Sequence, residues 1–230
     1  MSQLLIALEG IGFSYGPDRP VLCDCTFGLR AQERVGLVGP NGSGKTTLLW
    51  LIVGLLKPTA GRVWAFGRVR AEERDFREVR ARAGLLFQDS DDQLFCPTVA
   101  EDVAFGPLNL GRPRDQVRRI VARTLDALGL NGYEKRITYR LSGGEKRLVA
   151  LATVLAMEPE VLLLDEPTAG LDEEACQRVT RVLAGLPQAM LIVSHDRPFL
   201  DRMASRTVCL RRGRVEPLEP SPAAGDATPS

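Results

Sequence analysis

The stretch Gly39-Pro40-Asn41-Gly42-Ser43-Gly44-Lys45-Thr46 decides the fold of this 230-residue chain. It fits the pattern G-x-x-x-x-G-K-[ST], in which glycines let the backbone curl so that successive N–H groups point at phosphate oxygens. An apolar segment, residues 34–38, precedes the loop and is typical of a short buried strand. Residues 46–53 are expected to form a helix, whose N-terminus adds a partial positive charge. The sequence therefore predicts a phosphate-binding loop between a strand and a helix.

Two side chains at the end of this loop have the chemistry that a nucleoside triphosphate requires. Lys45 is expected to reach the β- and γ-phosphates, and the hydroxyl of Thr46 is expected to bind Mg²⁺. A chance glycine-rich turn is the alternative, and the strand, the lysine and the threonine in their proper order argue against it. Kinases, GTPases and many ATPases share such a loop, so it does not define the reaction.

A second candidate site lies at the end of an apolar run. Val161-Leu162-Leu163-Leu164-Asp165-Glu166-Pro167 reads as a fully buried strand that ends in two carboxylates. At the carboxyl end of a parallel strand, beside the phosphate loop, Asp165 can hold Mg²⁺ through water. Glu166 is then placed to accept a proton from an attacking water. The alternative is a solvated acidic pair that only ends the strand.

The rest of the chain alternates strand and helix patterns, which indicates an α/β fold. Residues 4–11 and 21–29 read as strands on either side of a Gly/Pro turn, and residues 207–210 as the last strand. We expect one domain over residues 1–216, with a helical lobe at about 88–157. The Pro/Ala/Ser-rich residues 217–230 are expected to be a disordered tail.

Composition, the N-terminal sequence and the cysteines indicate the general class of the protein. Apolar residues make up 44% of the chain, and 30 basic residues face 29 acidic ones, for a net charge of +1. This balance argues against a protein that holds nucleic acid by bulk charge. The N-terminus does not read as a secretory signal, so we expect a cytoplasmic protein with reduced thiols. Cys23 and Cys25, two apart on a predicted strand, are expected to be buried on one face.

The pentapeptide Leu141-Ser142-Gly143-Gly144-Glu145, which precedes Asp165 in the chain, identifies the family. Together with the phosphate loop it resembles the ATP-binding subunit of ABC transporters, over nearly the whole chain. The resemblance implies a P-loop NTPase fold of the ABC ATPase type. Such a fold has a mixed sheet core, an N-terminal antiparallel β subdomain and a helical subdomain. It also implies an ATPase with ATP and Mg²⁺ as cofactors.

The resemblance also assigns expected roles to single residues. Tyr15 matches the aromatic residue that stacks on adenine, and Gln88 the glutamine that touches Mg²⁺ and the attacking water. His195, the sole histidine, matches the residue that contacts the γ-phosphate. Asp172 lies in the loop that links two nucleotide sites. Each could instead be an ordinary structural residue, but they occur in the family's order. The expected ATP-binding residues are Tyr15, Gly39, Pro40, Asn41, Gly42, Ser43, Gly44, Lys45, Thr46 and Thr47.

The resemblance also implies a dimer. Residues 141–145 would bind the γ-phosphate of ATP held by a second copy of the chain, or by a paralogous ATPase, in a head-to-tail sandwich. Ser142, Gly143 and Gly144 are expected at the start of a helix, which is a ready anion site. ATP would close the dimer and hydrolysis would open it. The expected Mg²⁺ ligands are Thr46, Gln88 and Asp165, and Glu166, His195 and Gln88 are the expected catalytic residues.

Residues 87–107 indicate the branch of the family. They look like the energy-coupling-factor importers, especially the cobalt/nickel branch. There a short helix, here near residues 92–95, docks a membrane scaffold subunit, so Gln93, Leu94 and Phe95 are expected partner contacts. A substrate-binding membrane subunit would complete the importer, with this chain peripheral on the cytoplasmic face of the membrane. Val99 and Val103 are expected to fill the lobe.

The sequence leaves three alternatives to a cobalt or nickel importer. The same motor could serve biotin or another vitamin, since the ATPase does not touch the cargo. A soluble ABC ATPase acting on DNA or ribosomes is disfavoured, because the chain holds one cassette, no long coiled-coil insertion and a neutral net charge. A non-catalytic regulator would be expected to lack Glu166 or His195, and both are present.

Overall fold

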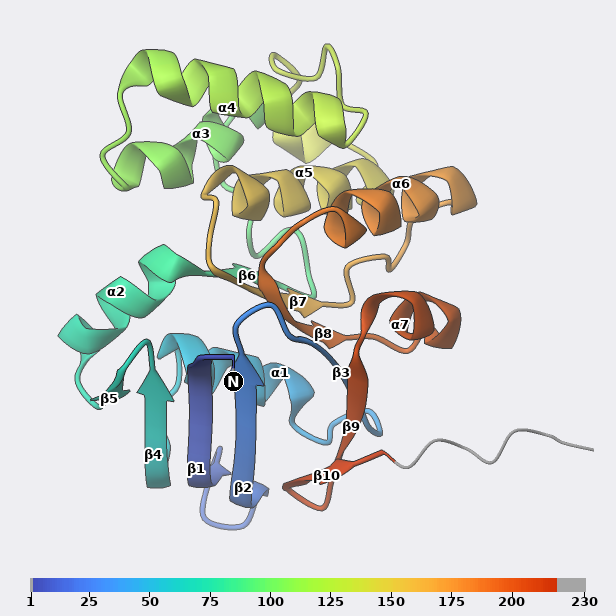
Figure 1. Ribbon diagram of the computed structural model, residues 1–230. Coiled ribbons are helices and arrows are strands. Elements are labelled where there is room, and N and C mark those ends of the chain that lie inside the picture. The colour runs from blue at the N-terminus through green and yellow to red at the C-terminus, as the bar shows by residue number, and fades with distance from the viewer. Residues whose placement is uncertain (1, 219–230) are drawn as a thin grey trace, which may run out of the picture.

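The computed structural model describes residues 2–218 (Figure 1). Its strands alternate with helices as the α/β pattern predicts. The strands are β1 (Leu4–Ser14), β2 (Pro20–Arg30), β3 (Arg34–Val38), β4 (Ala60–Ala65), β5 (Arg68–Arg70), β6 (Ala83–Leu86), β7 (Val161–Asp165), β8 (Ala189–Val193), β9 (Arg206–Arg211) and β10 (Arg214–Pro217). The helices are α1 (Lys45–Val53), α2 (Glu73–Arg82), α3 (Val99–Asn109), α4 (Arg114–Ala127), α5 (Gly143–Ala156), α6 (Glu173–Ala184) and α7 (Arg197–Met203), with a 3₁₀ turn at Thr138–Arg140.

Two sheets form the lower part of the molecule. The N-terminal sheet has the order β2-β1-β4-β5 and is antiparallel throughout. The larger sheet has the order β10-β9-β3-β8-β7-β6 and is parallel except for the β9–β10 hairpin. Every residue of β7 and β8 is buried, as expected for central parallel strands covered on both faces. Because β3, β7 and β8 run in one direction, their carboxyl ends meet at one edge.

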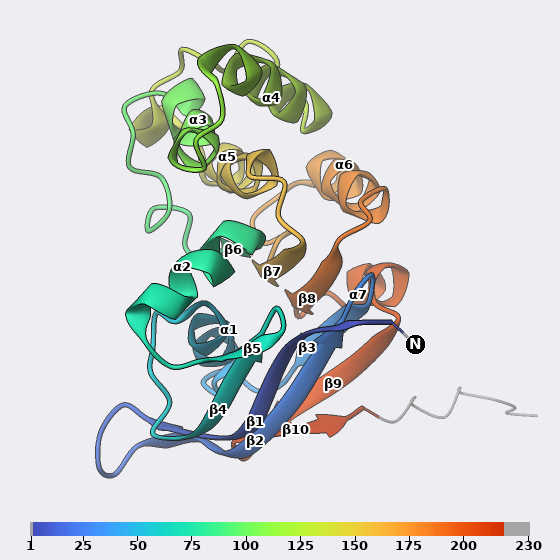
Figure 2. The same cartoon turned by 60° about the vertical axis from the view of Figure 1, so that its left-hand side comes forward.

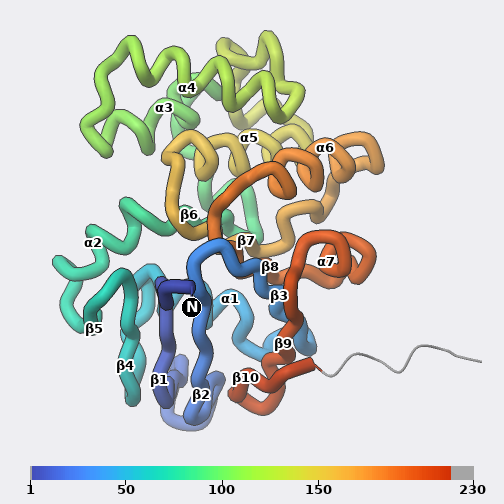
Figure 3. The backbone as a smooth tube through the Cα atoms, viewed as in Figure 1, coloured from blue at the N-terminus to red at the C-terminus, as the bar shows by residue number. Residues whose placement is uncertain are grey.

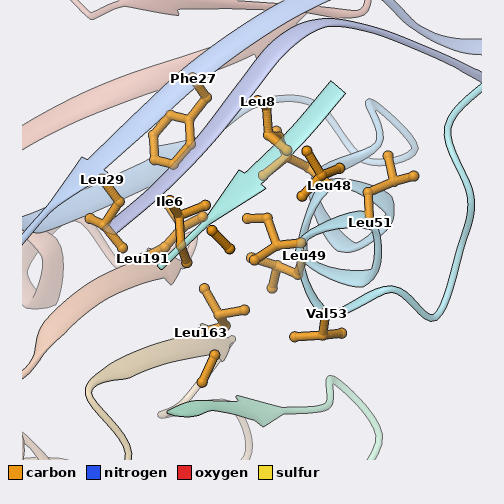
Figure 4. Close-up of a cluster of buried hydrophobic side chains, with 14 of the residues drawn as sticks. Ile6, Leu8, Phe27, Leu29, Leu48, Leu49, Leu51, Val53, Leu163 and Leu191 are labelled. Carbon is orange, nitrogen blue, oxygen red and sulfur yellow. The ribbon is translucent and has the colours of Figure 1, made fainter. Parts of the chain in front are cut away.

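Helix α1 is enclosed between the two sheets (Figure 2). It is apolar on nearly all sides, with Leu48, Leu49, Leu51 and Ile52 fully buried. A helix without a polar face must be covered all round. Figure 4 shows its side chains among those of β1 and β2, with Leu163 of β7 and Leu191 of β8 closing the cluster. The helix that begins at the phosphate loop is thus part of the main core.

A second core joins the opposite face of the large sheet to the helices above it (Figure 3). Helices α3, α4 and α5 lie together there and make up the helical lobe. Val99 and Val103 of α3 are fully buried in this cluster, as predicted. The lobe therefore rests on the sheet through α5, while α3 and α4 lie further out.

Four local features differ from the sequence expectations. Residues 91–93 form a hydrogen-bonded turn closed by Ser90, not a short helix. Cys25 is buried but Cys23 is exposed, because the left-handed φ of 55° at Asp24 breaks the strand alternation. The chain also continues past the expected last strand into β10. Of the expected tail 217–230, Pro217 ends that strand and residues 219–230 lie outside the described part.

Within residues 2–218, no helix is both long and apolar enough to cross a bilayer.

Gly54 offers a test of how tightly α1 is enclosed. It ends α1 with a left-handed φ of 72°, and a Cβ there would lie 2.2 Å from the Phe76 ring. We expect Gly54→Ala to lower the free energy of unfolding by about 2–4 kcal/mol, through backbone strain and overpacking. Gly111, at a φ of 75° with open space around it, is the matched control, and Gly111→Ala should lower it by about 1 kcal/mol. Equal losses in urea unfolding would contradict the enclosure.

Candidate functional site

The phosphate loop lines a cavity of about 830 Å³. Gly44 precedes α1 with a left-handed φ of 102°, and a Cβ there would lie 2.6 Å from Val21. No described side chain caps this helix, so its first N–H groups remain available to an anion. The cavity also collects side chains from distant segments: Tyr15, Asn41, Lys45, Thr46, Thr47, Gln88, Asp165, Glu166 and His195. The structure therefore brings most of the expected ATP-binding and catalytic residues to one place.

Lys45 is nearly buried and folded back on its own loop. Its Nζ donates to the carbonyl oxygens of Gly39 at 2.8 Å and Pro40 at 3.0 Å. The ammonium group is thus held over the loop, where phosphate oxygens would lie in a bound nucleotide.

Thr46 and Asp165 join the two halves of the site. The Thr46 hydroxyl donates to Oδ2 of Asp165 at 2.6 Å. Burial raises the pKa of Asp165, and this hydrogen bond opposes the shift. The same cavity presents three oxygen ligands that suit Mg²⁺: the Thr46 hydroxyl, the Asp165 carboxylate and the Gln88 amide. Among the described residues, no group of three or more His, Cys, Asp or Glu side chains is arranged to hold a metal ion.

Glu166 follows Asp165 with a left-handed φ of 52°, which turns its side chain toward the end of β8. Its Oε2 accepts from the Ser194 hydroxyl and from the His195 N–H, both at 3.3 Å. Its Oε1 is buried with no hydrogen-bond partner among the described residues, and Nε2 of His195 lies 3.7 Å from it. A carboxylate oxygen with a free lone pair in a phosphate cavity can take a proton from water.

Arg147 is a site residue that the sequence analysis missed. Its buried guanidinium, on α5, donates to the carbonyl oxygens of Phe87, Gln88, Asp165 and Glu166. Burial lowers its pKa to about 10, so it stays charged at neutral pH. One side chain thus ties the signature helix to the Gln88 segment and to the end of β7. Lys146-Arg147 is an ordinary basic pair in the sequence, and only helix position separates the buried Arg147 from the partly buried Lys146.

Tyr15 and Asp172 have identifiable local partners. The Tyr15 hydroxyl lies 3.1 Å from Oγ1 of Thr47, and its ring packs edge-on against Phe13. Asp172 caps α6, and its carboxylate accepts from the Ala175 N–H at 2.8 Å. Adenine stacking by Tyr15 and a dimer role for Asp172 remain predictions.

The signature segment begins α5, as expected. Ser142 is the N-cap, and its hydroxyl and the Glu145 carboxylate cap each other's N–H groups. Leu141 is buried. Gly143 and Gly144 border a second cavity, of about 760 Å³, which Thr46 and Gln88 also line. Anion binding in trans by this turn remains a prediction.

The three expected partner contacts have different surroundings. The Gln93 amide accepts from the Phe87 N–H at 3.0 Å and donates to Ala150 and Thr153 of α5. Leu94 is partly buried against the second core, whereas Phe95 is 65% exposed. The polar atoms of Gln93 are hydrogen-bonded inside the lobe, which fastens the segment after Gln88 to α5. Partner contact by Gln93, Leu94 and Phe95 remains a prediction. Phe95 is the one that offers an apolar surface.

Comparison with known proteins adds independent findings. Residues 22–169 match the family described as ABC transporter. The energy-coupling factor transporter ATP-binding protein EcfA of Methanothermobacter thermautotrophicus is 44% identical over 215 residues, covering 92% of this chain and 69% of that protein. CbiO1 from Clostridium perfringens, part of the ABC transporter complex CbiONQ, has a TM-score of 0.80 at 32% identity, over 93% of this chain and 87% of that one.

A dimeric ATP-binding cassette in a post-hydrolysis state, bound to ADP and Pi, has a TM-score of 0.85 at 25% identity. The match covers 92% of this chain and 97% of that one. The expected fold class is therefore confirmed.

The cavity predicts the effect of removing its ammonium group. Lys45→Ala should weaken nucleotide binding about tenfold to a hundredfold, because a charge-assisted phosphate contact is lost. Isothermal titration with ADP would measure it. Lys57→Ala, at an exposed lysine beyond α1, is the control and should bind as the parent does. Unchanged affinity in Lys45→Ala would place the phosphates elsewhere.

Proposed function

The chain belongs to the ABC transporter family as an ATPase of the energy-coupling-factor type, and from that premise we propose that it is the motor subunit of a membrane importer. One observation carries the proposal. The cavity that holds Lys45, Thr46, Asp165 and Glu166 is joined by the segment after Gln88 to an exposed apolar groove.

The site residues suggest how hydrolysis proceeds. Lys45 would exchange the Gly39 and Pro40 carbonyls for phosphate oxygens. Thr46, Gln88 and Asp165 would hold Mg²⁺, which neutralises phosphate charge when bound. Oε1 of Glu166 would take the proton of the attacking water, and His195, beside it, would contact the γ-phosphate. Ser142, Gly143 and Gly144 of a second copy would complete the site, so that ATP closes a head-to-tail dimer.

The groove lies between β6 and α3 and has a volume of about 250 Å³. Phe95 and Phe105 meet there edge-to-face, with ring centroids 4.7 Å apart, and both are exposed. Asp102 also lines the groove; it is buried, and its Oδ2 has no hydrogen-bond partner among the described residues. Such a groove suits an apolar helix that also presents a hydrogen-bond donor. We propose that this occupant is a cytoplasmic helix of a membrane scaffold subunit.

The remaining assignments follow from this docking. The chain would act as one domain over residues 1–216, peripheral on the cytoplasmic face of the membrane, with a separate small membrane protein that binds the cargo. Cobalt or nickel is the proposed cargo, from the resemblance over residues 87–107. Biotin or another vitamin is the alternative.

Glu166→Gln tests the proposed chemistry. We expect nucleotide affinity to be retained, hydrolysis to slow about a hundredfold or more, and an ATP-bound dimer to accumulate, because the proton acceptor is lost. Phosphate release and size-exclusion chromatography with ATP would measure both. Full hydrolysis by the variant would assign the base elsewhere, and full hydrolysis by a chain that stays monomeric would contradict the composite site.

Copurification tests the transport role. Tagged Glu166→Gln chain, solubilised from host membranes with ATP present, should bring down a scaffold membrane subunit and a small membrane protein. The small protein would then be assayed for cobalt, nickel and vitamin binding.

Phe95→Ala, added to the tagged Glu166→Gln chain, should abolish this copurification, because the groove loses its exposed ring. In the chain that keeps Glu166, Phe95→Ala should leave ATPase activity intact. Val69→Ala, at an exposed apolar side chain of β5, should change neither. Recovery with ribosomes or DNA-bound proteins would overturn the transport role.

A further inference from the structure

The signature turn carries a negative side chain that three groups hold in place. Glu145 Oε1 accepts from the Tyr133 hydroxyl at 2.7 Å and from Nη1 of Arg136 at 2.9 Å. Its Oε2 accepts from the Ser142 N–H at 2.8 Å. The Arg136 guanidinium lies over the Tyr133 ring, 3.5 Å from its centroid. The carboxylate of Glu145 is thus fixed at the first turn of α5, beside Ser142.

Glu145 cannot lose its charge at physiological pH. The Tyr133 hydroxyl and the Ser142 N–H, with a smaller contribution from Arg136, hold the pKa of Glu145 at about 2. A fixed carboxylate favours the start of a helix, but it repels a second anion that approaches the same turn. A terminal phosphate at Ser142 and Gly143 would be such an anion.

The basic side chains near the first turn of α5 differ in whether they pair with Glu145. Lys146, next along α5, is paired with Asp91 at 2.5 Å. Arg140 lies over the Tyr139 ring and makes no ion pair among the described residues. Arg136 is the cation that contacts Glu145. Its side chain is half exposed, so it is accessible from solvent beside the first turn of α5.

We propose that Arg136 is a positioning residue that compensates the charge of Glu145, so that the first turn of α5 can receive the terminal phosphate of ATP held by a second copy of the chain. This inference rests on the proposed ATP sandwich. Arg136 acts through Glu145 and does not touch the nucleotide of its own chain, because Lys45 and Thr46 line the separate loop cavity.

The experiment measures ATP-driven dimerisation by sedimentation in the Glu166→Gln chain, which preserves ATP. Adding Arg136→Ala should weaken dimerisation about tenfold, because an uncompensated carboxylate faces each phosphate. Nucleotide affinity of the monomer and the thermal midpoint should stay near those of the parent. Arg136→Lys should keep most of the dimerisation. Arg140→Ala, in the same segment, should dimerise as the parent does.

A second substitution separates charge from loop structure. Glu145→Gln keeps the side-chain shape and a capping oxygen but removes the charge. Combined with Arg136→Ala, it should restore dimerisation to within about twofold of the parent, and the loss in Arg136→Ala should shrink near 1 M salt. A double variant as weak as Arg136→Ala, or normal dimerisation of Arg136→Ala, would overturn the inference. A parent that does not dimerise with ATP would overturn the sandwich itself, and this inference with it.

Discussion

Parallel pairing of β3 with β8 and of β8 with β7 is the constraint on which the rest of the structure depends. In this register three segments leave the sheet at the same edge: the loop after Val38, the carboxylates after Leu164 and the polar pair after Val193. The strands are too apolar to keep a polar side chain inside, so polar chemistry begins only where they end. The hydrogen bond from Thr46 to Asp165 then spans two segments that lie far apart in the sequence.

Side chains near this edge also connect the helical lobe to the large sheet. Arg147 places one cation among four backbone carbonyls that belong to the segment before α3 and to the end of β7. Gln93 adds two hydrogen bonds from that segment to α5 and one within the segment. Rotation of α5 would therefore displace Gln88 and the Glu166 backbone together. The start of α5 and the site residues at the sheet edge would therefore move together.

Much of this site could be predicted from sequence, because its main residues belong to contiguous patterns with a fixed backbone context. The loop 39–46 and the strand ending in Asp165 and Glu166 are of this kind. Side-chain direction in irregular segments could not be predicted in the same way. Gln93 and Phe95 stand two residues apart in a turn, yet one is bonded inward and the other is exposed. The inward arginine of α5 and the broken alternation at Cys23 have the same origin, since local backbone geometry and packing, not composition, decide which atoms face the protein.

The self-contacts of Lys45 carry a consequence for ligand choice. Two of the three N–H donors of its ammonium group are used by the carbonyl oxygens of Gly39 and Pro40, so a phosphate oxygen takes the third donor or replaces one of these bonds. A monophosphate brings few oxygens to this ammonium group, whereas a di- or triphosphate brings several. Contacts at Lys45 therefore favour nucleotides with more phosphates, whatever their base.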